Sequence, residues 1–188
     1  MDLSVMERFL TKENIREHLS YLNGMRLKYS IIEKSILGIK DKTPREIYKM
    51  NLSKELKNEI LPLINGIICH KIYFSSFVGR PLPCKEIKRF FTSEQSFLYE
   101  LSEIGKTVEY GFLLIGIDRR GRPYISCYND FCGSIPEGAV LALDLSEHAY
   151  FLDYHYEKGK YLNSALNFLD MGKLFLENKR ENYLDSLV

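Results

Sequence analysis

The spacing of apolar residues changes after Gly105, and this change constrains the fold more than any other feature of the sequence. Before it, apolar residues recur every three or four positions over long runs, which is typical of one face of an α-helix. After it, short apolar segments alternate with turn residues, which is typical of β-strands. A helical first half followed by a mixed second half predicts an α+β fold.

Two long helical runs account for most of the first half. The first extends from Thr11 to about Leu37, and Thr11 is a suitable N-cap. The second extends from about Ser53 to Phe77, and we expect Pro62 and Gly66 to interrupt it. The sequence therefore predicts a helical hairpin over residues 1–80.

The second half contains three predicted strands among shorter helices. Two short helices are expected within residues 85–106, a helical turn at 146–156, and a last helix from about 160 to 179. The predicted strands are residues 109–118, 122–128 and 139–145. We expect them to form a three-stranded antiparallel sheet in a C-terminal α+β domain, residues 81–188, with the functional site between the two domains.

Composition excludes several classes of partner. The chain has 26 Lys and Arg against 25 Asp and Glu, and this balance argues against a nucleic-acid surface. No apolar stretch approaches the roughly 20 residues that a membrane span needs, and no signal peptide is recognisable at the start. The four cysteines form no CxxC pair, which is typical of reduced thiols. We expect a soluble cytoplasmic protein without nucleic-acid or membrane partners.

Three of the four histidines occupy positions from which they could bind one metal ion. His18 and His70 lie on the two long predicted helices. Asp144 ends a predicted strand, and His148 follows it by four residues at the junction with a helix. Three imidazoles and one carboxylate suit iron or manganese and leave a further position for solvent or substrate. Spacing alone leaves open the alternative that these histidines are incidental.

A resemblance to a known family extends over most of the chain. The segment at 142–154, ALDLSEHAYFLDY, closely resembles the iron/manganese superoxide dismutase signature D-x-W-E-H-A-Y-Y-x-D-Y. The segment at 69–74, CHKIYF, is similar to the family motif around its second ligand, and residues 10–29 align with its first helix. The resemblance implies that one iron or manganese ion per chain is bound by His18, His70, Asp144 and His148.

The family's activity follows from the same resemblance. It implies that the metal alternates between two oxidation states while superoxide is disproportionated to dioxygen and hydrogen peroxide. The family's glutamate at the position of Glu147 reaches across a dimer interface to a metal-bound histidine of the other subunit. The resemblance therefore implies a homodimer formed through the Glu147 region.

Several groups that surround the metal in the family are replaced here. The family's gateway tyrosine falls on Arg26, which is either a cation that attracts superoxide or an ordinary exposed residue. A hydrogen-bonded His–Tyr pair across the interface falls on Leu22 and Phe151, so an apolar pair is expected in its place.

The glutamine that contacts the metal-bound solvent is also missing. One of its two family positions is Gly66, and the other falls in the loop at 129–131, where Asn129 or Asp130 would substitute for it. Arg26, Asp130 and Glu147 are therefore the candidate catalytic residues. The alternatives left open are a catalytically impaired metal-binding or scaffold homologue, an interaction module with incidental histidines, and occupancy by zinc.

Overall fold

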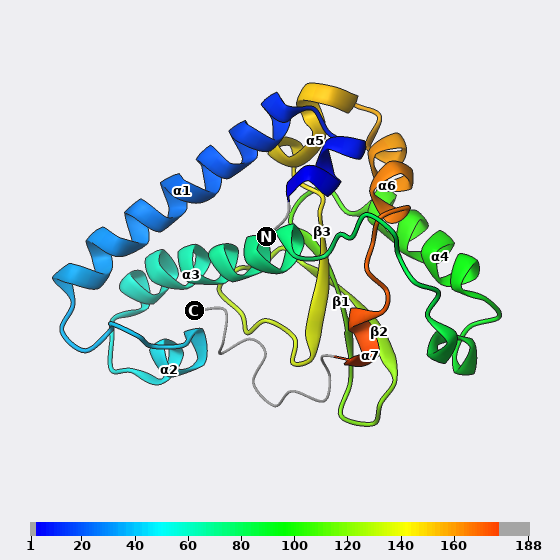
Figure 1. The fold of residues 1–188 in the computed structure, drawn as a ribbon. Helices are drawn as coiled ribbons and strands as arrows, with labels where there is room; N and C mark the ends of the chain where they lie inside the picture. Colours follow the sequence, from blue (N-terminus) through cyan, green and yellow to red (C-terminus); the bar gives the residue numbers. More distant parts are fainter. Residues whose placement is uncertain (1–2, 177–188) are drawn as a thin grey trace.

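A computed structural model describes residues 3–176 of the chain. Two long helices, α1 (Lys12–Ser35) and α3 (Lys54–Phe74), form an antiparallel hairpin with the short helix α2 (Pro44–Lys49) at its far end (Figure 1). The N-caps agree with the sequence pattern, because the side chains of Thr11 and Ser53 accept hydrogen bonds from the backbone N–H of the third residue of each helix. The short 3₁₀ helix η1 (Leu3–Arg8) precedes α1.

Helix α3 is continuous, so the predicted interruption at Pro62 and Gly66 is wrong. A proline removes only one backbone N–H, and the burial of nearly every residue from Ile64 to Phe74 holds the helix together around it. The helix ends at Phe74, short of the predicted Phe77. His70 therefore lies on a rigid segment within the buried half of α3.

The predicted antiparallel sheet is confirmed. Its strands are β1 (Phe112–Ile117), β2 (Pro123–Tyr128) and β3 (Ala139–Asp144), in the order β2-β1-β3. The tight turn between β1 and β2 has Gly121 at φ +75°, a conformation that favours glycine. The central strand β1 and the edge strand β3 are buried along their whole length, which places the end of β3 inside the protein.

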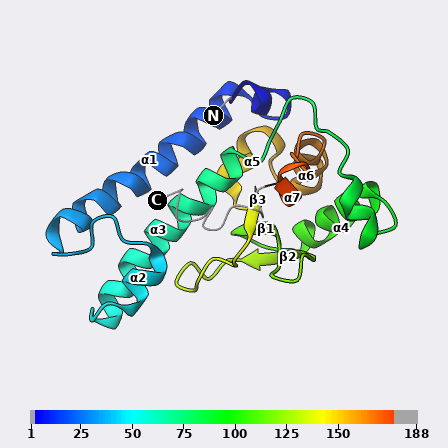
Figure 2. The ribbon, with the colours of Figure 1, turned by 60° about the horizontal axis from the view of Figure 1, so that its bottom comes forward.

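Shorter helices lie beside the sheet (Figure 2). They are η2 (Lys85–Arg89), α4 (Glu94–Thr107), α5 (Glu147–Tyr154), α6 (Lys158–Leu166) and α7 (Lys173–Leu176). The single last helix predicted over 160–179 is wrong, because α6 ends and α7 starts anew after a gap. In that gap the backbone of residues 168–170 bonds to that of residues 76–78, which a continuing helix could not do. Positions 177–179 of the prediction lie outside the described residues.

One apolar core includes residues from both halves of the chain. Ile68 and Ile72 of α3 belong to it together with Leu141 and Leu143 of β3 and Ala165 of α6. The division into residues 1–80 and 81–188 therefore stays a prediction. Among residues 3–176, no helix combines the length and apolar character that crossing a membrane requires.

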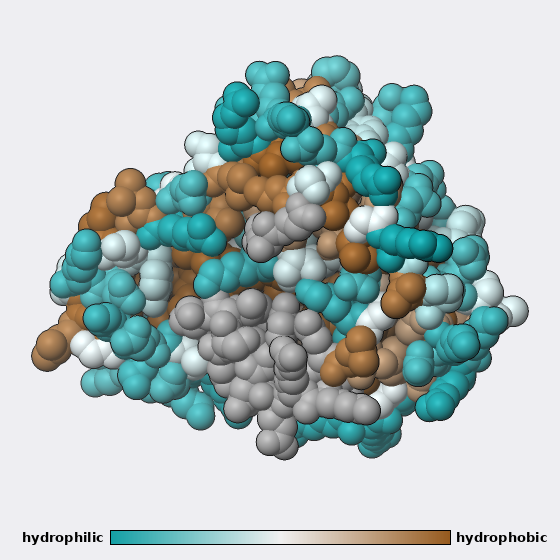
Figure 3. All heavy atoms as spheres, in the orientation of Figure 1, coloured by the Kyte–Doolittle hydropathy of each residue, from teal (hydrophilic) through white to brown (hydrophobic). Residues whose placement is uncertain are grey.

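Apolar side chains also reach the surface at one end of the molecule. In the space-filling view some of them lie over the far end of the α1–α3 hairpin, where α1 leads toward α2 (Figure 3). Leu27, Ile31 and Leu37 are among the exposed residues there. The opposite end of α1, which carries His18, is packed against α5 and the core.

Candidate metal centre

Four side chains from four different elements converge next to the sheet. They are His18 of α1, His70 of α3, Asp144 of β3 and His148 of α5. One potential ligand atom from each lies within 4.8 Å of the others. The structure therefore brings together the four residues that the sequence singled out as ligands.

The junction between β3 and α5 positions two of these residues. Asp144 is the last residue of β3, and the next residue, Leu145, donates a backbone hydrogen bond to Gly111 at 2.8 Å. The Ser146 N–H donates to Oδ1 of Asp144 at 3.0 Å, which leaves Oδ2 free to face the histidines. His148 then lies in the first turn of α5.

Oδ2 of Asp144 is the centre of the cluster. It lies 3.1 Å from Nε2 of His18, 3.1 Å from Nε2 of His148 and 3.5 Å from Nε2 of His70. Burial alone raises the pKa of this carboxyl, but attraction to His148 and His18 outweighs burial and holds the pKa well below its usual value. The site therefore contains one ionised carboxylate.

His70 presents a lone pair to that carboxylate. Its Nδ1 lies 2.7 Å from the backbone oxygen of Gly66, and since a carbonyl only accepts, Nδ1 carries the proton. Burial lowers the pKa of His70 to about 4, so the ring is neutral at pH 7 and Nε2 is unprotonated. An unprotonated nitrogen beside a carboxylate oxygen is repulsive unless a cation lies between them.

His18 lacks hydrogen-bond partners for both ring nitrogens. The side chain is fully buried, and although Nε2 is 3.1 Å from Oδ2 of Asp144, the direction of approach makes no hydrogen bond. Burial lowers the pKa of His18, and contact with Asp144 opposes that effect. A buried polar group without a partner is costly, and a bound ion would provide the missing partner for Nε2.

These observations fit a transition metal ion. Ligand atoms that lie about 2.1 Å from one ion, at angles of about 95–115°, are separated by about 3.1–3.5 Å. The separations around Oδ2 of Asp144 and the 3.3 Å between Nε2 of His70 and Nε2 of His148 agree with that spacing. Three imidazole nitrogens and one carboxylate oxygen suit iron, manganese and also zinc.

Aromatic rings enclose the buried side of the cluster. The ring of His18 lies 5.1 Å from that of Tyr73 and 4.9 Å from that of Phe74, and the ring of His70 lies 5.1 Å from that of Phe112. These three aromatic rings lie beside the histidines in a chain that has no tryptophan. They keep bulk water away from the cluster on this side.

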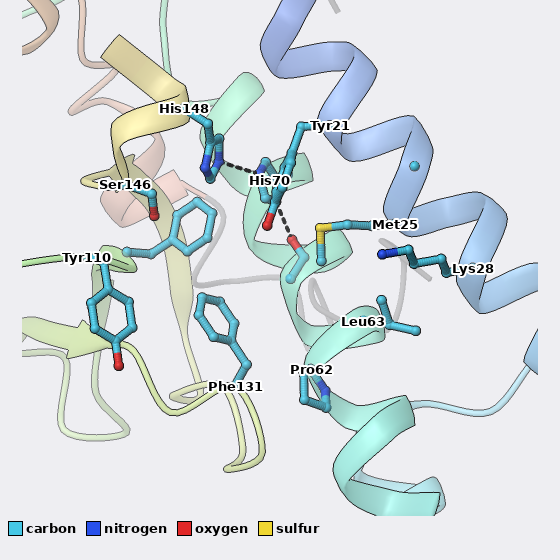
Figure 4. Close-up of a pocket in the computed structure, with 13 residues that line it drawn as sticks. Tyr21, Met25, Lys28, Pro62, Leu63, His70, Tyr110, Phe131, Ser146 and His148 are labelled. Atoms are coloured by element: carbon cyan, nitrogen blue, oxygen red, sulfur yellow. Dashed lines mark hydrogen bonds between the residues drawn. The ribbon is translucent and has the colours of Figure 1, made fainter. Parts of the chain in front are cut away.

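A pocket of about 530 Å³ opens on the other side (Figure 4). His70 and His148 contribute to its wall. Most of the remaining wall is apolar, and within residues 3–176 Lys28 of α1 is the one lysine, arginine or carboxylate that lines it. An anion that enters this pocket reaches His148, the most exposed of the four clustered residues.

Tyr21 and Met25 are among the pocket residues that were missed from the sequence. The ring of Tyr21 is stacked on that of His148, with centroids 4.1 Å apart and an interplanar angle of 25°. Met25 lies against Gly66, where an added Cβ would come within 2.3 Å of the Met25 Cε. The available signal was helical spacing, since residues three and seven positions after His18 lie on nearly the same side of α1.

Arg26 lies on a different side of α1. Arg26 follows His18 by eight residues, which places it about 80° around the helix axis from His18. Tyr21 is displaced from His18 in the opposite direction around the axis. The side chain is exposed, donates to Oδ1 of Asn23 at 3.3 Å and is not among the residues that line the pocket. Its role as a cation that attracts superoxide therefore stays a prediction.

Asp130 and Glu147 are also exposed. Asn65 anchors the loop after β2 by donating to the backbone oxygens of Phe131 and Gly133, and this turns Phe131 toward the pocket. Asp130 instead accepts a hydrogen bond from the backbone of its own turn. Glu147 begins α5 next to His148. Neither carboxylate joins the cluster, and their catalytic roles stay predictions.

Comparison with known proteins bears on the same residues. The model of the family "Iron/manganese superoxide dismutases, C-terminal domain" matches residues 83–175, which include Asp144 and His148. The "Superoxide dismutase [Fe]" of Cupriavidus metallidurans is 32% identical over 119 residues, which is 59% of this chain and 60% of that protein. The chain thus spans less than two thirds of the length of this relative.

Proposed function

We propose that this chain, which belongs to the iron/manganese superoxide dismutase family, disproportionates superoxide to dioxygen and hydrogen peroxide with one metal ion per chain. The observation that carries the proposal is the convergence of three Nε2 atoms on one carboxylate oxygen, with Nε2 of His70 unprotonated. Iron or manganese bound there would supply one-electron oxidation of one superoxide and one-electron reduction of the next.

The residues of the chain hold that metal and exclude water. Asp144 contributes one negative charge, and His18 and His70 are kept neutral by burial. The backbone oxygen of Gly66 fixes the tautomer of His70, as an outer partner of a metal ligand commonly does. A rigid ligand set of this kind disfavours large rearrangement when an electron is gained or lost.

The pocket provides access for a small anion. Lys28 lines it, so its ammonium group attracts superoxide toward the exposed part of the cluster. The hydroxyl-bearing residues Tyr21, Tyr110 and Ser146 also line the pocket and would donate hydrogen bonds to a bound oxygen species. Arg26 would add to the positive field from the neighbouring surface of α1.

A homodimer through the Glu147 region forms part of the proposal. Glu147 is exposed beside His148 and would contact a metal-bound histidine of the second copy. Sedimentation of the purified protein tests this, with Glu147→Ala expected to dissociate the dimer. A monomeric wild type contradicts it. Leu22 is only 1% exposed within one chain, so the predicted Leu22–Phe151 pair has little support.

One feature favours the second candidate, a metal-binding homologue with impaired catalysis. No glutamine or asparagine lines the pocket in the described part of the chain. Met25 fills the space next to Gly66, and Asn129 is exposed. An apolar thioether cannot hold the proton of a metal-bound solvent as an amide would.

Metal analysis and an activity assay test both candidates. Protein purified without chelator is expected to contain about one iron or manganese per chain and to consume superoxide. Asp144→Ala and His70→Ala should lose the metal, while His155→Ala, which changes the one histidine outside the cluster, should keep it. Metal without activity favours the second candidate. Absence of stoichiometric metal from the wild type contradicts both.

A further inference from the structure

His148 has the least protein around it of the four clustered residues. Its side chain is 27% exposed, whereas the other three are at most 3% exposed. His70 is fixed by its bond to Gly66, and His18 is enclosed by aromatic rings. An imidazole that is bound only through Nε2 can rotate where no protein packs against its exposed side. The orientation of the His148 ring therefore requires another contact.

Tyr21 provides the contact on that side. Within residues 3–176, the rings that pack against His148 are those of His18, His70 and Tyr21, and only Tyr21 lies outside the cluster. Its ring is stacked nearly parallel on the imidazole, with the centroids 4.1 Å apart. Figure 4 shows Tyr21 extending from α1 past His70 and beside His148, with its hydroxyl directed into the pocket.

We infer that Tyr21 is a positioning residue that holds the His148 imidazole with Nε2 toward a shared metal ion and covers the solvent side of the site. The inference rests on the proposed function, because it assumes that the cluster binds a metal. Contact between the two rings positions the His148 imidazole, because stacking depends on the face of the tyrosine ring and not on its hydroxyl. A phenylalanine should therefore replace Tyr21 without loss of metal affinity.

Metal affinity distinguishes the contribution of the Tyr21 ring from that of the Tyr21 hydroxyl. Mn²⁺ binding is measured by competition with a chelator for the wild type and for each variant. Tyr21→Ala should weaken binding about 10-fold or more, as losses of outer partners of metal ligands do. Tyr21→Phe should bind as the wild type does. Tyr99→Ala is the matched control, because Tyr99 is exposed on α4 and does not line the pocket.

A fluorescent probe reports on the contact directly. The chain contains no tryptophan, so Tyr21→Trp introduces a single indole at the position that faces His148. Anaerobic addition of Fe²⁺ should quench its fluorescence at one equivalent of metal. The same addition should leave the fluorescence of Tyr99→Trp nearly unchanged.

The outcomes separate this inference from the proposed function. A wild type that binds neither Mn²⁺ nor Fe²⁺ contradicts the proposed function itself. A wild type that binds Mn²⁺ while Tyr21→Ala binds it equally well overturns only the role of Tyr21. The role of Tyr21 is also overturned if Tyr21→Ala binds Mn²⁺ more weakly and its metal-free form unfolds at a lower temperature than the metal-free wild type. That result would reveal a purely structural effect.

Discussion

Asn14 and His18 account for four of the five buried side-chain polar atoms that lack a hydrogen-bond partner in residues 3–176. They lie one turn apart on α1, so their side chains share one face of the helix. A neutral His18 that offers Nε2 to a metal carries its proton on Nδ1, which then needs an acceptor. Oδ1 of Asn14 is a buried acceptor without a partner, one helical turn before His18.

Replacing Asn14 should therefore weaken metal binding. Asn14→Leu is expected to lower the affinity for Mn²⁺ about 10-fold, because the proton on Nδ1 of His18 loses the acceptor that Oδ1 of Asn14 would provide in the metal-bound protein. The free energy of unfolding of the metal-free protein should not fall. The unpaired buried amide of Asn14 destabilises the wild type by about 1–3 kcal/mol, and the leucine removes that amide. Chelator competition and urea unfolding measure the two effects. Unchanged affinity would refute the link between Asn14 and His18.

Ser76 connects helix α3 to strand β3, and thereby two elements that carry the cluster. Its buried hydroxyl donates to the backbone oxygen of Ile72 at 2.8 Å and accepts from the backbone N–H of Ala142 at 2.8 Å. The backbone oxygen of Ser76 also accepts from the N–H of Asp170 in the segment between α6 and α7. One residue thus holds three elements in register behind the site.

Loss of this hydroxyl should destabilise the fold. Ser76→Ala leaves the buried N–H of Ala142 without a partner, which costs about 1–3 kcal/mol of unfolding free energy. Ser35→Ala is the control, because that hydroxyl bonds only within the exposed end of α1 and should change the free energy by less than about 0.5 kcal/mol. Urea unfolding of the metal-free proteins measures both. Equal stability of the two variants would show that the connection is unimportant.

Two buried neutral histidines, His18 and His70, make the stability of the whole molecule depend on pH. The pKa of His70 is about 4 in the folded protein against a usual value of 6.5, and burial lowers the pKa of His18 as well. The unfolded chain therefore binds protons at a higher pH than the folded chain does. The carboxyl of Asp144 does not contribute in this range, because its unfolded pKa is near 3.8 and its folded pKa is lower still.

The metal-free protein should accordingly lose stability in acid. Its free energy of unfolding is expected to fall as the pH drops from about 6.5 to about 4, since protons bind preferentially to the unfolded state in that interval. Urea unfolding of chelator-treated protein at several pH values measures this. His70→Gln should reduce the slope. A flat profile across the interval would mean that His70 is not held neutral.

The elements of the fold were largely predictable from local patterns. The two long helices, the N-cap at Thr11, the three strands and the turn at Gly121 follow from periodicity, capping and backbone preferences, which act over a few residues. The errors at Pro62 and after Leu166 arose where packing overrode a local signal. In the first case burial held a helix together, and in the second backbone pairing with residues 76–78 ended one.

The sequence by itself determined which four residues were candidate ligands, because a short motif around His148 and two histidines on long helices are visible without coordinates. Only the tertiary structure decided what surrounds them. Whether Arg26 or Tyr21 faces His148 depends on the rotation of α1 about its axis, and that rotation is set by packing against α3 and α5. Distances between atoms far apart in the chain are properties of the packed core, and no local pattern encodes them.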